Sequence, residues 1–217
     1  MRMRKRAGSA LFMVAAATLT LGLGVTAALA ATTLTVKVTH GGTYKATAPA
    51  TVLRDNGFGV TCSGTSTAKA SRATGSIPTA VTTGTSPVKI GTVATLRFKN
   101  CTGPRGAVTI TVSKLPYSVN VDSKTSRAGQ TDVIIAGVST SVSMKGCSFR
   151  VTGSAPGFYS NSTHKLAMQP KLPISPLNAA QLTIGHVAGC GGAVKNGDHP
   201  TYKASYTLSR AIKISSK

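Results

Sequence analysis

The stretch TYKASYTLSRAIKIS, residues 201–215, decides the fold class of this chain. Its apolar side chains share one parity: Tyr202, Ala204, Tyr206, Leu208, Ile212 and Ile214. Its polar side chains share the other parity: Lys203, Ser205, Thr207, Ser209 and Lys213. Only Arg210 interrupts the apolar series. Alternation with a period of two is typical of strands with one buried and one solvated face, so the segment predicts antiparallel β-structure.

The same alternation recurs along the chain, whereas no segment has the 3.6-residue periodicity of a helix. TTLTVKV (32–38) and GAVTITVS (106–113) are the clearest further examples. Shorter candidate strands lie at 43–48, 50–54, 58–62, 88–98, 117–121, 133–135, 138–144, 147–152, 165–169 and 180–187. Gly, Pro, Ser and Thr clusters separate them, as in a sandwich or a barrel. We therefore expect an all-β, antiparallel β-sandwich or barrel-like fold.

Two stretches are expected to be loops. TGSIPTAVTTGTSP (74–87) is rich in turn-forming residues, and MQPKLPISPLN (168–178) is stiffened by three prolines. Neither stretch contains the bulky apolar alternation that marks the candidate strands.

Residues 1–30 are expected to be a secretory signal peptide. Four basic residues between Arg2 and Arg6 precede the apolar run LFMVAAATLTLGLGVTAALA (11–30), which ends in the small-residue sequence Ala28-Leu29-Ala30. This order is typical of a cleaved signal peptide; the alternative is an uncleaved membrane anchor. Cleavage would leave an extracellular chain, 31–217, with no transmembrane segment.

The chain beyond residue 30 is strongly basic. It contains twenty-one of the 25 Lys and Arg residues, four Asp and no Glu, which gives a formal net charge of +17. Such a field attracts polyanions, and outside a cell the candidates are anionic cell-wall or surface polymers. The densest basic segment, RFKNCTGPR, makes Arg97, Lys99 and Arg105 the candidate anion-binding residues. The alternative is a solvated basic surface that only maintains solubility.

Specific nucleic-acid binding is not expected. The basic residues are spread singly, and no aromatic stacking motif lies among them.

Four cysteines, Cys62, Cys101, Cys147 and Cys190, predict two disulfides, because an even number in an exported protein is normally oxidised. Their spacing is too wide for the usual zinc motifs, and a free reactive thiol is the remaining alternative. Four cysteines allow three pairings. The similar separations of the first and last two cysteines suggest two pseudo-repeated β units, 31–122 and 123–217, and this repeat favours Cys62–Cys101 with Cys147–Cys190.

Enzymatic activity is not expected, and no catalytic, cofactor-binding or metal-binding residue is assigned. General acid–base catalysis draws mainly on His, Asp and Glu, of which the chain has four, four and none. Asp198 and His199 are adjacent in NGDHP, but this is a typical turn sequence. His186 shares the parity of Ile184, which predicts a buried, hydrogen-bonded histidine.

The chain resembles secreted, four-cysteine, β-rich proteins of actinobacteria whose function is uncharacterised. The resemblance is carried by the following segments: HGGTYKATA (40–48), GVTCSG (59–64), TLRFKNCTGP (95–104), TVSKLPYSVN (111–120), KGCSFRVTG (145–153), VAGCGG (187–192) and NGDHPTYKASYTLS (196–209). It implies an exported, disulfide-bonded β protein and brings no catalytic residues with it.

The sequence therefore predicts a secreted, non-catalytic β protein of the cell envelope or extracellular space that binds anionic polymers through its basic surface. Two alternatives stay open. One is a secreted hydrolase, and the other is an inhibitor or toxin-like module that binds a protein through a loop such as 168–178.

Overall fold

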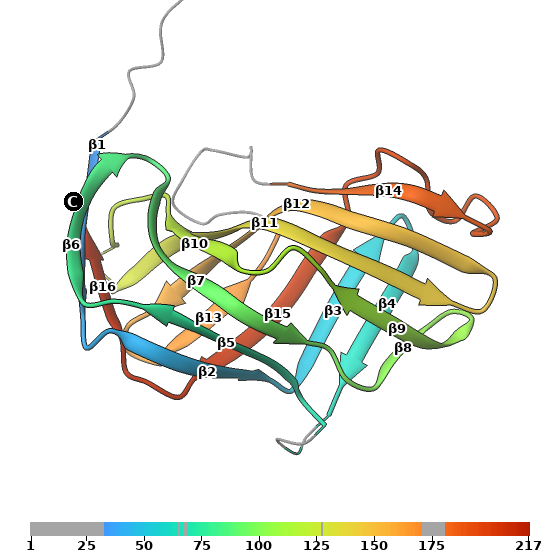
Figure 1. Ribbon diagram of the computed structural model, residues 1–217, viewed down its shortest axis with the longest axis horizontal. Helices are drawn as coiled ribbons and strands as arrows, with labels where there is room; N and C mark the ends of the chain where they lie inside the picture. Colours follow the sequence, from blue (N-terminus) through green and yellow to red (C-terminus); the bar gives the residue numbers. More distant parts are fainter. Residues whose placement is uncertain (1–32, 65, 67–68, 127, 171–180) are drawn as a thin grey trace, which may run out of the picture. The chain divides into compact units, whose positions relative to one another are not determined.

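The computed structural model describes residues 33–64, 66, 69–126, 128–170 and 181–217, and this part of the chain is all-β. Its strands are β1 (Thr33–Thr39), β2 (Gly42–Ala48), β3 (Ala50–Asp55), β4 (Phe58–Ser63), β5 (Ser71–Ile77), β6 (Ala80–Thr85), β7 (Val88–Arg97), β8 (Cys101–Gly103), β9 (Gly106–Val112), β10 (Tyr117–Val121), β11 (Gln130–Met144), β12 (Cys147–Ser160), β13 (Lys165–Met168), β14 (Leu182–Ala188), β15 (Thr201–Leu208) and β16 (Lys213–Ser216). All pairings are antiparallel and no described residue is helical, which confirms the predicted fold class (Figure 1).

The larger of the two sheets closes on itself. Its strands run in the order β14-β12-β13-β15-β2-β5-β7-β10-β11-β9-β8-β4-β3, and two further pairings join β12 to β11 and β15 to β3. These two pairings create two closed circuits of hydrogen-bonded strands, which share β11, β12, β13 and β15. Inward-facing side chains from all sides of the circuits meet in one core.

The long hairpin β11–β12 joins the two circuits. The first half of β11 pairs with β10, and its second half pairs with β9. Gly137, on β11, has a φ of 79° and lies opposite no residue of β12. The pairing register of the two strands therefore shifts at this residue. Gly153, with a φ of 118°, lies beside this bulge on β12. A bulge bends the strand and increases its twist, so each half of the hairpin can follow a different set of neighbours.

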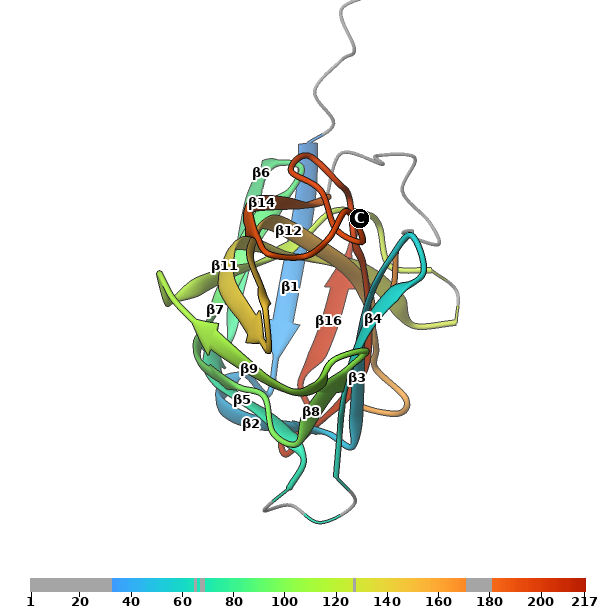
Figure 2. The same ribbon diagram turned by 90° about the vertical axis from the view of Figure 1, so that its right-hand side faces the viewer.

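A separate three-stranded sheet, β16-β1-β6, covers one end of this core. Figure 2 is turned by 90° from Figure 1, looks along the molecule toward this sheet, and shows β1 and β16 behind the surrounding strands. The alternation near the two ends of the described chain explains this position, because the even-numbered apolar side chains of β1 and β16 are buried. Those side chains are Leu34, Val36, Val38 and Ile214, and none is more than 3% exposed.

The predicted loop at 74–87 is wrong. Residues 71–77 form β5, and residues 80–85 form β6. Sequence reasoning missed β5 because its inward side carries small residues in place of large ones. A side chain at Gly75 would collide with the Tyr44 hydroxyl. The missing side chain on β5 therefore leaves room for the Tyr44 ring of the neighbouring strand β2. The other predicted loop, 168–178, lies mostly outside the described residues, and its first residue ends β13.

Both predicted disulfides are confirmed in the favoured pairing. Cys62 and Cys101 stand directly opposite each other on β4 and β8, with Cα atoms 3.9 Å apart. Cys147, at the start of β12, is bonded to Cys190, which follows β14. Each bond closes a loop of about forty residues, worth roughly 4 kcal/mol in the chain-entropy description of the unfolded state.

Residues 31–217 form one compact unit, and strands from the two expected repeats are interleaved in it. For example, β2 of the first half pairs with β15 of the second half. The duplication itself stays a prediction. The expected signal peptide, 1–30, lies outside the described residues.

We predict that the bend in the β11–β12 hairpin depends on Gly153 more than on Gly137. A Cβ at Gly153 would lie 2.3 Å from the Gln181 carbonyl oxygen, whereas a Cβ at Gly137 meets nothing within 4 Å. Gly137→Ala therefore adds only the backbone penalty, about 1 kcal/mol, and Gly153→Ala should cost about 3 kcal/mol or more. Urea denaturation of both variants measures the difference, and equal losses of stability would contradict the assignment.

Candidate functional site

The charges of the described chain are divided between its surface and its interior. Every described Lys and Arg is exposed except Arg150, which is half-buried. Of the four acids, Asp55, Asp122 and Asp132 are 7%, 6% and 0% exposed, and only Asp198 is half-buried. The surface is therefore almost purely cationic, because the few carboxylates are turned inward.

The three candidate anion-binding residues lie at two places in the fold, the end of β7 and the β8–β9 turn. Arg97 and Lys99 are exposed at the end of β7. Arg105 lies in the turn between β8 and β9, where its guanidinium donates hydrogen bonds to three backbone carbonyl oxygens. The acceptors are those of Gly146 (2.6 Å), Gly189 (2.9 Å) and Cys190 (3.2 Å). Arg105 thus ties the β8–β9 turn to the Cys147–Cys190 region, a structural role that sequence reasoning did not find.

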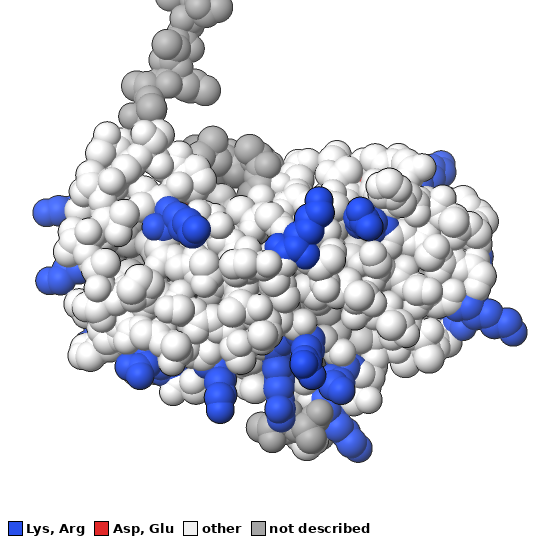
Figure 3. All heavy atoms as spheres, viewed as in Figure 1, with Lys and Arg blue, Asp and Glu red and all other residues white. Residues whose placement is uncertain are grey.

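A different arginine accompanies Arg97. Arg72, on β5, stands directly opposite Arg97 in the register, and both side chains are exposed. The Asn100 side chain donates to the Lys69 carbonyl, which brings the segments carrying Lys69 and Lys99 together. We call Lys69, Arg72, Arg97 and Lys99 the basic edge. Figure 3 shows Lys and Arg side chains gathered over β2, β5 and the end of β7, with no acidic patch on this face.

Sequence reasoning missed Arg72 because it did not predict β5. An arginine in an unassigned loop has no defined neighbour, whereas its place in the register puts it beside Arg97.

Two of the four acids converge, contrary to the expectation from their sequence contexts. The carboxyl group of Asp55, at the end of β3, lies near that of Asp198, in the segment before β15, and the two interact. Two neighbouring carboxyls disfavour each other's charged form. Burial is the largest cause that raises the pKa of Asp55, to about 6; Asp198 raises it further and His199 opposes the shift.

Local hydrogen bonds hold this acid pair in place. The backbone N–H of Lys195 donates to Asp198 Oδ2 (2.7 Å), and the Asp198 carbonyl accepts from the N–H of Ile184 (2.8 Å). His199 Nδ1 lies 3.1 Å from the Leu182 carbonyl oxygen. The NGDHP turn is therefore fixed against β14, as turn chemistry predicts, and it also carries the second carboxyl.

The prediction of a buried His186 is wrong. Its side chain is exposed, and its backbone has a φ of 53°. The left-handed conformation breaks the alternation of β14 at this residue, so the parity that predicted burial does not extend to it.

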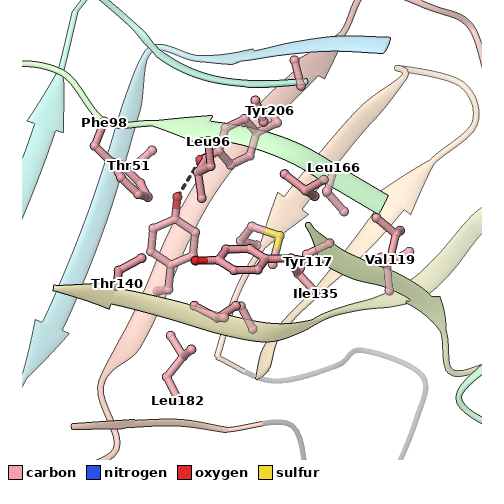
Figure 4. A pocket seen from close by; sticks show the side chains of 18 of the residues that line it. Thr51, Leu96, Phe98, Tyr117, Val119, Ile135, Thr140, Leu166, Leu182 and Tyr206 are labelled. Atoms are coloured by element: carbon pink, nitrogen blue, oxygen red, sulfur yellow. Dashed lines mark hydrogen bonds between the residues drawn. The ribbon is translucent and has the colours of Figure 1, made fainter. Parts of the chain in front are cut away.

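The interior contains an apolar cavity of about 120 Å³ (Figure 4). Strands of both circuits contribute to its walls, including β2, β3, β7, β11 and β15. No charged side chain is among its lining residues, and the only polar ones besides tyrosines are Thr51 and Thr140. An unfilled core cavity of this volume costs on the order of 3 kcal/mol relative to a packed core.

All five tyrosines of the chain line this cavity, but their hydroxyls differ in their partners. The hydroxyls of Tyr44, Tyr117 and Tyr159 donate to backbone carbonyls in the walls. Those of Tyr202 and Tyr206 are hydrogen-bonded to each other at 2.8 Å (Figure 4). Thr51, on β3, stands opposite Ala204, which lies between the two tyrosines on β15. The cavity therefore has one polar spot, formed by Thr51, Tyr202 and Tyr206.

Burial keeps this polar spot neutral. It raises the pKa of Tyr206 to about 12 and that of Tyr202 well above its ordinary value. Both hydroxyls are protonated at any physiological pH, so they act as neutral donors and acceptors.

Comparison with protein families, with curated proteins and with solved structures gives no match to this chain. Among the described residues, no group of three or more His, Cys or Asp side chains is arranged to hold a metal ion. The described part of the chain also has no helix with the length and hydrophobicity needed to cross a membrane.

We predict that the acid pair makes stability fall as pH rises. The folded chain holds the Asp55 proton more tightly than the unfolded chain, so this contribution is complete below about pH 4 and is lost as pH rises through about 6. In the unsubstituted chain, the free energy of unfolding should fall between pH 4 and pH 7.5. Asp55→Asn removes the repulsion and should make this fall smaller by roughly 1–3 kcal/mol.

Thermal or urea unfolding at both pH values measures this effect, and Asp198→Asn should change it in the same direction. An Asp55→Asn chain with the same pH dependence as the parent chain would show that Asp55 does not cause the fall in stability.

Proposed function

We propose that this protein is a non-catalytic binding protein of the extracellular space or cell envelope, which attaches to anionic polymers through the basic edge. The observation that carries the proposal is the division of charge. The cations are exposed, and three of the four carboxylates are buried. Exposed carboxylates would neutralise neighbouring lysines and arginines, and here few are in a position to do so.

The Arg72–Arg97 pair supports the choice of the basic edge. Like charges directly opposite each other on neighbouring strands destabilise a sheet by roughly 0.2–1 kcal/mol. A phosphate or carboxylate bound between the two guanidiniums would turn this destabilising repulsion into a stabilising interaction. Arginine pairs with such groups through parallel hydrogen bonds. A polymer with repeated negative charges can also contact several of these cations at once, which strengthens its binding.

Export is part of the proposal. Two disulfides are typical of proteins that work in an oxidising compartment. The basic, apolar and small-residue order of residues 1–30, together with the resemblance to secreted actinobacterial proteins, supports the same location. The polymers in question would then be the phosphate-rich or carboxylate-rich chains of a cell wall or surface.

The hydrolase alternative has one observation in its favour, the Asp55–Asp198 pair beside His199. None of these three residues lines the apolar cavity. We therefore favour binding over hydrolysis. The proposed inhibitor-like loop at 168–178 lies mostly outside the described residues.

We predict that the position of the cations matters more than their number. Arg72→Gln combined with Arg97→Gln removes two charges from the basic edge, and Lys37→Gln combined with Lys213→Gln removes two from the three-stranded sheet. All four side chains are exposed, so neither pair should unfold the chain.

Affinity for isolated Gram-positive cell walls that carry teichoic-type polymers is the measurement. The arginine variant should bind roughly fivefold to tenfold more weakly than the lysine variant. Equal losses would show that only the net charge acts and would contradict a defined binding edge.

A further inference from the structure

The geometry points to a second binding site inside the molecule: we propose that the apolar cavity binds a small, neutral, largely hydrocarbon ligand that carries one hydrogen-bond acceptor, such as a ketone or ester carbonyl. This site is independent of the basic edge, and either could be disproved without affecting the other.

The class of the ligand follows first from the absence of charge in the lining. A carboxylate, phosphate or ammonium group buried among the described lining residues would have no counter-ion, and burying an unpaired charge is strongly unfavourable. The volume, about 120 Å³, is of the order of a core cavity that stays dry and binds a benzene-sized molecule. The cavity therefore fits a compact apolar ring or a short hydrocarbon segment.

The hydrogen-bonding group of the ligand follows from counting protons. Tyr202 and Tyr206 have two hydroxyl protons, and the hydrogen bond that joins them uses one. Neither hydroxyl has a further hydrogen-bond acceptor among the described residues. Because a buried donor without a partner is unfavourable, a ligand carbonyl at this spot would be bound in preference to a plain hydrocarbon.

The route of entry follows from side chains that line the cavity and are still partly accessible. Leu53, Leu96, Phe98 and Tyr202 have this property, and so do Ile110, Val138 and Leu166 on other strands. Leu53 stands opposite Tyr202 on β3 and β15, and the ring of Phe98 packs edge-on against Tyr202 at 6.3 Å. The first four positions therefore meet where the end of β7 approaches β3 and β15, and this is where we place the entrance.

The composition of the chain provides a direct assay. All five tyrosines of the chain line the cavity. The chain labelled with 3-fluorotyrosine therefore has five ¹⁹F reporters at the site and none elsewhere. The probes are cyclopentanone, cyclopentane and cyclopentanecarboxylate, which share a ring and differ in the polar group. Cyclopentanone should shift the ¹⁹F signals at the lowest concentration, cyclopentane should bind roughly fivefold more weakly, and the carboxylate should not bind.

Substitutions test the two parts of the site separately. Tyr202→Phe combined with Tyr206→Phe should abolish the preference for cyclopentanone over cyclopentane, which the three remaining tyrosines report. Tyr159→Phe is the control, because its hydroxyl is bonded to the Ile212 carbonyl in the wall. Ala46→Val should fill the cavity and weaken both neutral probes, whereas Ala48→Val, on the same strand but outside the lining, should not.

Three results would overturn the proposal, and each can be read with the unsubstituted chain or with a single variant. They are the absence of ¹⁹F shifts with saturating neutral probe, binding of the carboxylate as tight as that of the ketone, and unchanged probe binding in Ala46→Val.

Discussion

The pairing of β11 with β12 is the constraint on which the rest of the structure depends. The two strands belong to both closed circuits of the larger sheet, and the bulge at Gly137 lets their halves turn toward different neighbours. One half of the hairpin pairs with β10 and β13, and the other half pairs with β9 and β14. Without this bend, one of these two sets of strands would lose its pairing. Closure then leaves few open strand edges, which is one way in which β proteins avoid edge-to-edge association.

Closure also separates two chemical environments. Side chains of one parity enter a shared interior, which here is apolar, incompletely filled and lined by every tyrosine. Side chains of the other parity form an exterior rich in Lys, Arg, Ser and Thr. The same alternation that builds the strands therefore provides both a hydrophobic site and a cationic surface. The disulfides join β4 to β8 and the start of β12 to the segment after β14, and Arg105 bonds the β8–β9 turn to that same segment.

Much of the fold could be predicted from alternation alone, because Leu34, Val36 and the tyrosines of β15 show directly which face is buried. The disulfide pairing could be predicted from spacing. The strand β5 could not, since the space at Gly75 is taken by the Thr92 carbonyl and the Tyr44 ring, which belong to its two neighbouring strands. For the same reason, the sequence did not predict that Arg72 lies beside Arg97 or that Asp55 lies beside Asp198. Each of these contacts depends on strand order, which local periodicity does not determine.

The salt dependence of binding to isolated, polymer-bearing cell walls tests the central claim, that an uncompensated cationic exterior attaches this protein to anionic chains. Charges exposed to solvent are screened beyond about 10 Å at 0.1 M salt. The account predicts strong retention at low ionic strength that falls steeply as salt is added. Retention that does not change with salt, or no retention at low salt, would contradict it.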